Sequence, residues 1–224
     1  MIEQDRPERG RLLRHDVDQI LDRARIELDR LTFEAKLERL PTRGSRHNTL
    51  LALFTLSAYH AIVERGIEPS YAAELVADVG WKFYERMVAV PRFIARCLHR
   101  DPQKQINFIL RLFLIYPFSS AGKPGYELKA WSEADRYCTF WTHCPPLQAV
   151  RDYIEKHGDH GELEVFQRSW CTYDWALTYA MVGGGFQQKG YYERPHTMSK
   201  GDDVCDMCWY AHPPGGKADV DGEN

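Results

Sequence analysis

The chain has 224 residues and a formal net charge of −3, with 44% apolar and 27% charged residues. A chain of this length fits one large domain or two closely packed halves, and it can bury a core without disulfides. Its basic residues do not gather into one stripe, so we expect no nucleic-acid partner. Residues 1–14 are charged without an apolar core, and no stretch approaches the ~20 apolar residues of a membrane span. We therefore expect a cytoplasmic protein with no membrane partner.

The first half of the chain predicts helices, because apolar residues recur three or four positions apart. Thr49 is a plausible N-cap, and Gly66 and Asp101-Pro102 mark a helix end and a helix start. The predicted helices are residues 12–40, 49–65 and 69–88, a fourth that Pro91 starts or kinks and that ends near residue 100, and 102–116.

The composition changes at residues 117–125, which are rich in Ser, Gly and Pro and predict a boundary. Beyond it we expect strands at 126–134 and 137–142, helices at 145–156 and 161–181, and a strand pair at 186–194 and 204–211. The fold class is therefore α+β, with a helical N-terminal half packed on a small mixed α/β half that has an antiparallel sheet. The predicted regions are 1–116 (helical), 126–212 (cysteine-bearing) and 213–224 (a disordered tail).

Six cysteines are present, and in a reducing cytosol we expect them to be reduced thiols or metal ligands rather than disulfides. Only Cys205 and Cys208 form a C-x-x-C pair, so a zinc ribbon is excluded by count. On a regular strand Cys205 and Cys208 face opposite sides, which argues against their holding one ion together.

Two short motifs carry further cysteines. Cys144 lies in Thr-His-Cys-Pro-Pro, where a strand gives way to a helix, and the helix dipole favours a thiolate there. His143 next to it is a candidate general base. In Trp-Cys-Thr-Tyr-Asp-Trp, Cys171 and Asp174 lie three apart, on one face if the segment is helical. Each motif also has a structural interpretation, as a half-buried turn cysteine and as a core helix with one surface aspartate.

The third motif begins at Arg194 and His196 and continues through a Gly201-Asp202 turn signal to Cys205. An ordinary hairpin would also have this pattern. His196 is a candidate general base. The guanidinium of Arg194 can bind a substrate carboxylate, or alternatively form a structural bridge to Asp202 or Asp206.

Taken in order, the three motifs resemble those of the L-2-amino-thiazoline-4-carboxylic acid hydrolase-like family. The matching pieces are Cys-Pro at 144–145, Cys-x-x-Asp at 171–174 and Arg-x-x-Thr-x-x-x-Gly-Asp-x-x-Cys-Asp at 194–206. The chain departs from the pattern at Cys208 and Trp209. The resemblance also extends to 4-vinyl-reductase-type ligand-binding domains, some of which hold zinc with cysteines and a glutamate; Glu164 is the nearest acidic counterpart here.

The resemblance implies hydrolysis of a small cyclic amidine or thiazoline-like substrate at a carbon flanked by nitrogen and sulfur. A thiolate can attack that carbon, with Cys171 as first choice and Cys144 or Cys205 as rivals. Asp174 or His196 would act as acid/base, and Arg194 and Thr197 would bind substrate. The same three cysteines can instead bind Zn²⁺, so the cofactor stays open. We expect Cys144, Cys171 and Cys205 to converge; the alternative function is a non-catalytic small-molecule or zinc-binding module.

Overall fold

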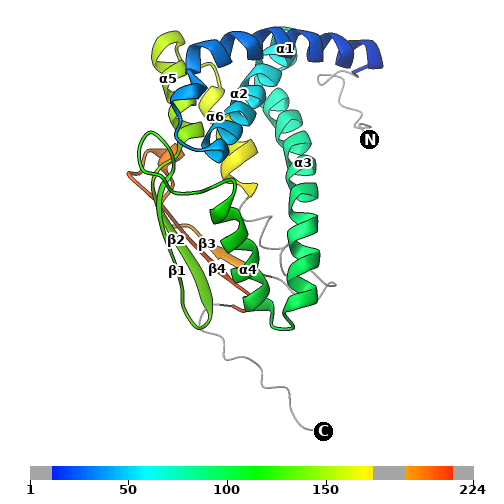
Figure 1. The fold of residues 1–224 in the computed structure, drawn as a ribbon. Coiled ribbons are helices and arrows are strands. Elements are labelled where there is room, and N and C mark those ends of the chain that lie inside the picture. Colours follow the sequence, from blue (N-terminus) through cyan, green and yellow to red (C-terminus); the bar gives the residue numbers. More distant parts are fainter. Residues whose placement is uncertain (1–11, 174–189, 214–224) are drawn as a thin grey trace. The chain divides into compact units, whose positions relative to one another are not determined.

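The structure is a computed structural model that describes residues 12–173 and 190–213 (Figure 1). In these residues the chain is α+β, as predicted, with helices mainly in the first half and an antiparallel sheet in the second. None of the described helices is both long enough and apolar enough to cross a membrane. The helices are α1 (Arg14–Ala35), α2 (Arg43–Val63), α3 (Pro69–Leu98), α4 (Pro102–Ile115), α5 (Pro145–His157) and α6 (Glu162–Phe166), with short turns η2 (Leu37–Arg39), η3 (Gln167–Cys171) and η4 (Met198–Lys200).

The chain divides into two compact units, each built from two sequence segments. Residues 1–82 and 144–172 form the first, here called the helical unit, and residues 83–143 and 173–224 form the second, the sheet unit. The Ser/Gly/Pro stretch at 117–125 lies within the sheet unit. The helical unit consists of α1, α2, α5, α6 and the first part of α3, with α2 packed against α1, α5 and α6.

Helix α2 begins earlier than the apolar pattern predicts. Thr42 is the N-cap, and its Oγ1 accepts a hydrogen bond from the Ser45 amide at 3.0 Å. The predicted cap at Thr49 is wrong, because Thr49 is a buried residue inside the helix. The first two turns of α2 bury small polar residues, which apolar periodicity does not detect.

Helix α3 runs through Pro91 as one helix. Of the two predicted alternatives at Pro91, the helix start is therefore wrong, and so is the helix end predicted at residue 88. Proline removes one backbone hydrogen bond of a helix interior. Val88 and Ala95 on either side of it are almost fully buried, and their burial stabilises the continuous helix. The predicted start at Asp101-Pro102 is confirmed: Asp101 caps α4 by accepting from the Lys104 amide at 2.9 Å.

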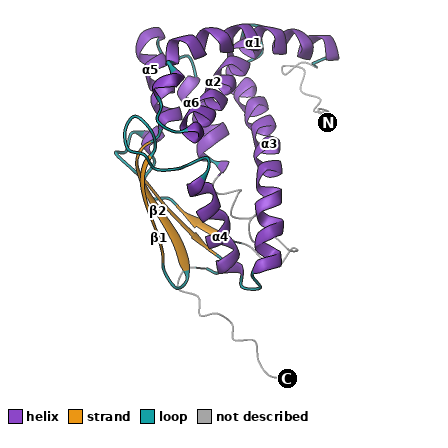
Figure 2. Cartoon of the chain, in the orientation of Figure 1, coloured by secondary structure: helices purple, strands orange, loops and turns teal. Residues whose placement is uncertain are grey.

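Four antiparallel strands form the described sheet, in the order β1-β2-β4-β3. Figure 2 draws the strands in orange. The predicted strands at 126–134, 137–142 and 204–211 are confirmed. The fourth predicted strand, at 186–194, is described only from residue 190, and there it has three residues. Helix α4 contacts β2 and β4. The strands are β1 (Glu127–Ser132), β2 (Arg136–His143), β3 (Tyr191–Glu193) and β4 (Cys205–Tyr210).

The side chain of Gln103 on α4 extends the pairing of β4 at its end. The Ala211 amide donates to Gln103 Oε1 at 2.8 Å, and Gln103 Nε2 donates to the Trp209 carbonyl at 3.4 Å. These bonds satisfy backbone groups at the point where β4 leaves the sheet. Aromatic rings fill the core nearby, where Phe118, Tyr126 and Trp141 pack edge to face at 5.3–5.5 Å between centroids.

Cys138 on β2 and Cys208 on β4 form a disulfide, which corrects the expectation that all six cysteines are thiols or ligands. The two residues are directly opposite each other in the β2–β4 register, with Cα atoms 4.2 Å apart. Cys97, Cys144, Cys171 and Cys205 are thiols. Cys205 is buried and Cys208 is half-buried, so the predicted alternation of β4 is confirmed.

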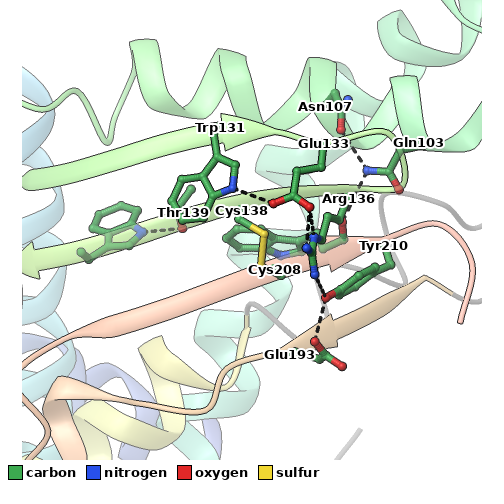
Figure 3. Close-up of a disulfide and its surroundings, with 12 residues drawn as sticks. Gln103, Asn107, Trp131, Glu133, Arg136, Cys138, Thr139, Glu193, Cys208 and Tyr210 are labelled. Carbon is green, nitrogen blue, oxygen red and sulfur yellow. Dashed lines mark hydrogen bonds and ion pairs between the residues drawn. A yellow bond between two sulfur atoms is a disulfide. The ribbon is translucent and has the colours of Figure 1, made fainter. Parts of the chain in front are cut away.

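A chain of polar side chains crosses the sheet beside the disulfide (Figure 3). Arg136 donates to Glu133 at 2.5 Å and to the Tyr210 hydroxyl at 3.4 Å. The Tyr210 hydroxyl in turn donates to Glu193 at 2.7 Å. The chain joins the β1–β2 turn to β4 and β3, so it supports the same strand order as the disulfide.

Two predicted segments extend beyond the described residues. The helix predicted at 161–181 is described only to residue 173, as α6 followed by the π-helical turn η3. The tail predicted at 213–224 lies outside the described residues apart from Pro213. The helix predicted at 145–156 is confirmed as α5.

Removing the disulfide should lower the stability of the sheet unit. The bond joins residues 70 apart in sequence, and closing a loop of that length is worth roughly 4 kcal/mol in the chain-entropy model. We expect Cys138→Ala/Cys208→Ala to unfold at lower denaturant concentration by that order. Urea unfolding with and without dithiothreitol measures the effect, and the reductant should shift the wild type but not the double variant. Equal midpoints for both proteins would contradict the bond's role.

Candidate functional site

The third motif folds into a compact loop between β3 and β4. The turn η4 occupies its middle and ends at Gly201, whose φ of 103° is a left-handed conformation that glycine adopts without strain. Thr197, Met198 and Ser199 are buried, whereas Lys200 to Asp203 are exposed. The Gly-Asp turn signal therefore marks a real reversal of the chain.

Three side chains from the end of this motif hold three consecutive backbone amides from its start. Asp206 Oδ1 accepts from the His196 amide at 2.7 Å. Asp202 Oδ2 accepts from the Thr197 amide at 2.7 Å. Cys205 Sγ accepts from the Met198 amide at 3.2 Å. The spacing of the motif thus has a local structural cause: these residues fix the path of the loop.

Asp206 also holds the imidazole of His196. Nδ1 of His196 donates to Asp206 Oδ2 at 2.7 Å, on the surface of the sheet unit. The hydrogen bond and the charge of Asp206 raise the pKa of His196 above its ordinary 6.5. Burial opposes ionisation of Asp206, but the hydrogen bonds from His196 outweigh it and lower the Asp206 pKa. An imidazole oriented by a carboxylate in this way can give and take protons.

Arg194 and Thr197 are the predicted substrate-binding residues. The guanidinium carbon of Arg194 lies 5.7 Å from the centre of the Tyr192 ring, a cation–π contact that orients its fork. The backbone of Thr197 is held by Asp202, and its side chain is buried. Both residues therefore belong to the same loop as His196.

Cys144 and Cys171 lie at the two ends of the second segment of the helical unit. Cys144 is the N-cap residue of α5, between β2 and the helix, as predicted. Cys171 is the last residue of η3, a π-helical turn, and both thiols are half-buried. His143 beside Cys144 donates from Nδ1 to the Gly125 carbonyl at 2.7 Å. Asp174, the predicted partner of Cys171, lies outside the described residues.

A buried network that sequence reasoning missed joins three helices of the helical unit. His60 on α2 has Nδ1 at 3.2 Å from Glu27 Oε1 on α1 and Nε2 at 2.9 Å from Glu162 Oε1 on α6. Glu162 is only 2% exposed, and it also accepts from the His160 amide at 2.5 Å. The imidazole of His60 therefore bridges one carboxylate from α1 and one from α6.

Arg30 adds a positive charge next to Glu27 in this network. It donates to Glu27 at 2.6 Å and to Glu34 at 2.7 Å, and its guanidinium lies over the Tyr153 ring. The hydrogen bond from Arg30 lowers the pKa of Glu27, although burial opposes it. Burial also opposes the charge of Glu162, but the bonds from His60 and the His160 amide lower its pKa to about 2.

The signal for this network was weak because its residues are far apart in the sequence. Glu27 and Glu162 occupy positions on the buried faces of α1 and α6, where a charged residue is rare without a partner. A charged residue at a core position of each helix is the pattern that could have predicted it.

No group of three or more His, Cys, Asp or Glu residues within the described ranges is placed to hold a metal ion. Cys144 and Cys171 belong to the helical unit and Cys205 to the sheet unit. Their convergence stays a prediction, and so does a shared zinc ion.

No family model matches the chain, and no curated protein or solved structure matches it significantly. The three motifs and their local geometry therefore carry the functional argument.

Asp206→Asn should lower the pKa of His196 towards 6.5. The pKa of His196 is higher in the folded than in the unfolded chain. The His196–Asp206 pair therefore stabilises the loop fully below the unfolded-state pKa of His196, and this stabilisation is lost as the pH rises through its folded-state pKa. An NMR titration of the His196 ring proton, assigned with His196→Gln, measures the shift. An unchanged titration midpoint in Asp206→Asn would show that the two side chains are not coupled in solution.

Glu162→Gln should destabilise the helical unit by on the order of 2–3 kcal/mol near neutral pH. The folded pKa of Glu162 is lowered from 4.5 to about 2. Its stabilisation is therefore complete above the unfolded pKa and is lost as the pH falls from about 4.5 to about 2. Denaturant unfolding of both proteins between pH 7 and pH 2 tests this, and a difference that stays constant over the range would refute it. Glu164→Gln, on the exposed side of α6, is the control.

Proposed function

We propose that the chain is a hydrolase that opens a small cyclic amidine or thiazoline-like ring, with Cys171 as nucleophile. The proposal rests on the resemblance of its three motifs to the L-2-amino-thiazoline-4-carboxylic acid hydrolase-like family. The residue roles are those that this resemblance implies.

The observation that carries the proposal is the environment of Cys171. It ends a π-helical turn, an interruption of α-helical geometry that occurs often at functional sites. Phe166 and Trp170 stack at 5.9 Å within the same turn region, and Trp170 Nε1 donates to Thr55 Oγ1 at 3.3 Å. The turn is thereby fixed on α2, and the Cys171 thiol is half-buried.

The rival thiols differ in what their surroundings favour. Cys205 is buried and its sulfur accepts the Met198 amide, which is a role in holding the loop. Cys144 is half-buried at the start of a helix of 13 residues, where the dipole favours the thiolate. Cys144 is therefore the stronger rival to Cys171.

The remaining roles follow the family resemblance and the loop geometry. His196, oriented by Asp206, supplies or accepts a proton, with Asp174 as the alternative acid/base. Arg194 binds the substrate carboxylate with its planar fork, and Thr197 is the second substrate-binding residue. No metal ion is required by this scheme.

The covalent scheme balances without an oxidant or reductant. The Cys171 thiolate forms a bond to the ring carbon between nitrogen and sulfur, giving a tetrahedral adduct. The adduct collapses as the ring carbon–nitrogen bond breaks, and an acid group gives a proton to the leaving nitrogen. Water then attacks the same carbon, releases the thiolate and completes the hydrolysis.

The test is turnover of 2-amino-thiazoline-4-carboxylate and a panel of related cyclic amidines by the full chain. Loss of the ring is followed by chromatography and mass spectrometry, and intact-protein mass detects a covalent adduct. We expect Cys171→Ala to lower kcat at least a thousandfold, because the nucleophile is removed. Cys97→Ser is the matched control, since Cys97 is an exposed thiol of the sheet unit outside the three motifs, and should keep full activity.

The outcomes separate the alternatives. Loss of activity in Cys144→Ala with a fully active Cys171→Ala would move the nucleophile to Cys144. Binding of a panel member without turnover would identify a non-catalytic small-molecule module. Neither binding nor turnover across the panel would remove the proposed substrate class.

A further inference from the structure

The part of α3 in the sheet unit has two different faces. On one face Val88 and Ala95 are almost fully buried, and the ring of Tyr84 lies 6.5 Å from that of Phe113 on α4. Tyr84, Val88 and Ala95 are spaced four and seven positions apart, so they align along one side of α3. This face anchors α3 within the sheet unit.

The other face carries large apolar side chains exposed to solvent. Phe83, Val90, Phe93 and Ile94 are 40–69% exposed, and Leu98 continues the row at the helix end. Their spacing of seven, three and four residues keeps them on one stripe about 24 Å long at 1.5 Å per residue. Single exposed apolar residues are common, but a continuous row of this kind marks an interaction surface.

Arginines border this stripe on one side. Arg86 lies seven residues before Phe93, on the same edge of the row. Arg96 lies three residues after Phe93, just outside that edge, and Arg100 follows the helix end. All three are exposed. Residues 83–100 contain four arginines and one glutamate, a net charge of +3 in a chain whose net charge is −3.

We propose that this stripe of α3 docks onto the surface of a membrane that contains anionic lipids. Aromatic and aliphatic side chains of such a helix enter the boundary between headgroups and acyl chains, and flanking arginines reach the headgroup phosphates. The helix lies along the surface and does not cross the bilayer. The sequence prediction of no membrane partner rests on the lack of a spanning apolar stretch, which a helix lying along the surface does not need.

Charge favours this occupant over a second copy of the chain. Two copies joined through the same face would bring their flanking arginines together, and like charges across an interface oppose association. An anionic bilayer offers the opposite charge along the whole length of the stripe.

The experiment is cosedimentation of the full chain with vesicles of phosphatidylcholine alone and of phosphatidylcholine with phosphatidylserine. We expect binding to the anionic vesicles only, with release at high salt. Arg86→Gln/Arg96→Gln should weaken binding roughly 25-fold, about fivefold for each charge. Phe83→Ser/Phe93→Ser should weaken it at least tenfold. These side chains are exposed, so circular dichroism should show unchanged folding.

The matched control is Arg25→Gln/Phe33→Ser, which removes an exposed arginine and an exposed phenylalanine from α1 and should bind as the wild type does. Absence of binding to anionic vesicles overturns the proposal. So does binding that the arginine pair weakens but the phenylalanine pair does not, which would indicate a purely ionic surface of the kind an acidic protein uses. A dimer in light scattering that Phe83→Ser/Phe93→Ser dissociates would assign the face to a second copy instead.

Discussion

Strand β4 lies between β2 and β3, and its register against β2 decides which of its side chains are buried. A shift by one residue would turn Cys205, Met207 and Trp209 outward and bring Asp206 into the core. The Cys138–Cys208 bond and the bonds of Gln103 to Trp209 and Ala211 exclude such a shift. Because β4 begins at Cys205, the same register also determines where the loop at 194–206 returns to the sheet. The orientation of His196 by Asp206 therefore depends on this pairing.

Much of the fold could be predicted from local pattern, and the errors have physical causes. Pro102 after Asp101, and the aromatic alternation of β2, are signals contained within a few residues, and they predicted α4 and β2 correctly. The start of α2 and the continuity of α3 through Pro91 depend on tertiary burial of Ser45 and of Val88, which a local pattern does not contain. The disulfide depends on register, because Cys138 and Cys208 become neighbours only when β4 inserts beside β2.

Of the candidate functional residues, too, only those with partners close in the sequence could be predicted. The Gly-Asp-x-x-Cys-Asp spacing was recognisable because each of its residues acts within ten positions of its partner: Asp202 on Thr197, Cys205 on Met198 and Asp206 on His196. The Glu27–His60–Glu162 network was not, because its partners are 33 and 102 residues apart. It joins three helices that carry no shared motif, and only the rarity of buried charge pointed to it.

The six cysteines show how environment, rather than residue type, sets chemical role. Cys138 and Cys208 face each other across paired strands and form a disulfide. Cys205, three residues before Cys208 on β4, uses its sulfur as a hydrogen-bond acceptor. Disulfides persist mainly in oxidising compartments, so this bond argues against the predicted cytoplasmic location. A thiol chemistry at Cys171 or Cys144 requires the opposite state, a reduced sulfur. Both states coexist in one chain because a bond between paired strands is held by the sheet, whereas the thiols of the helical unit have no cysteine opposite them in a strand register.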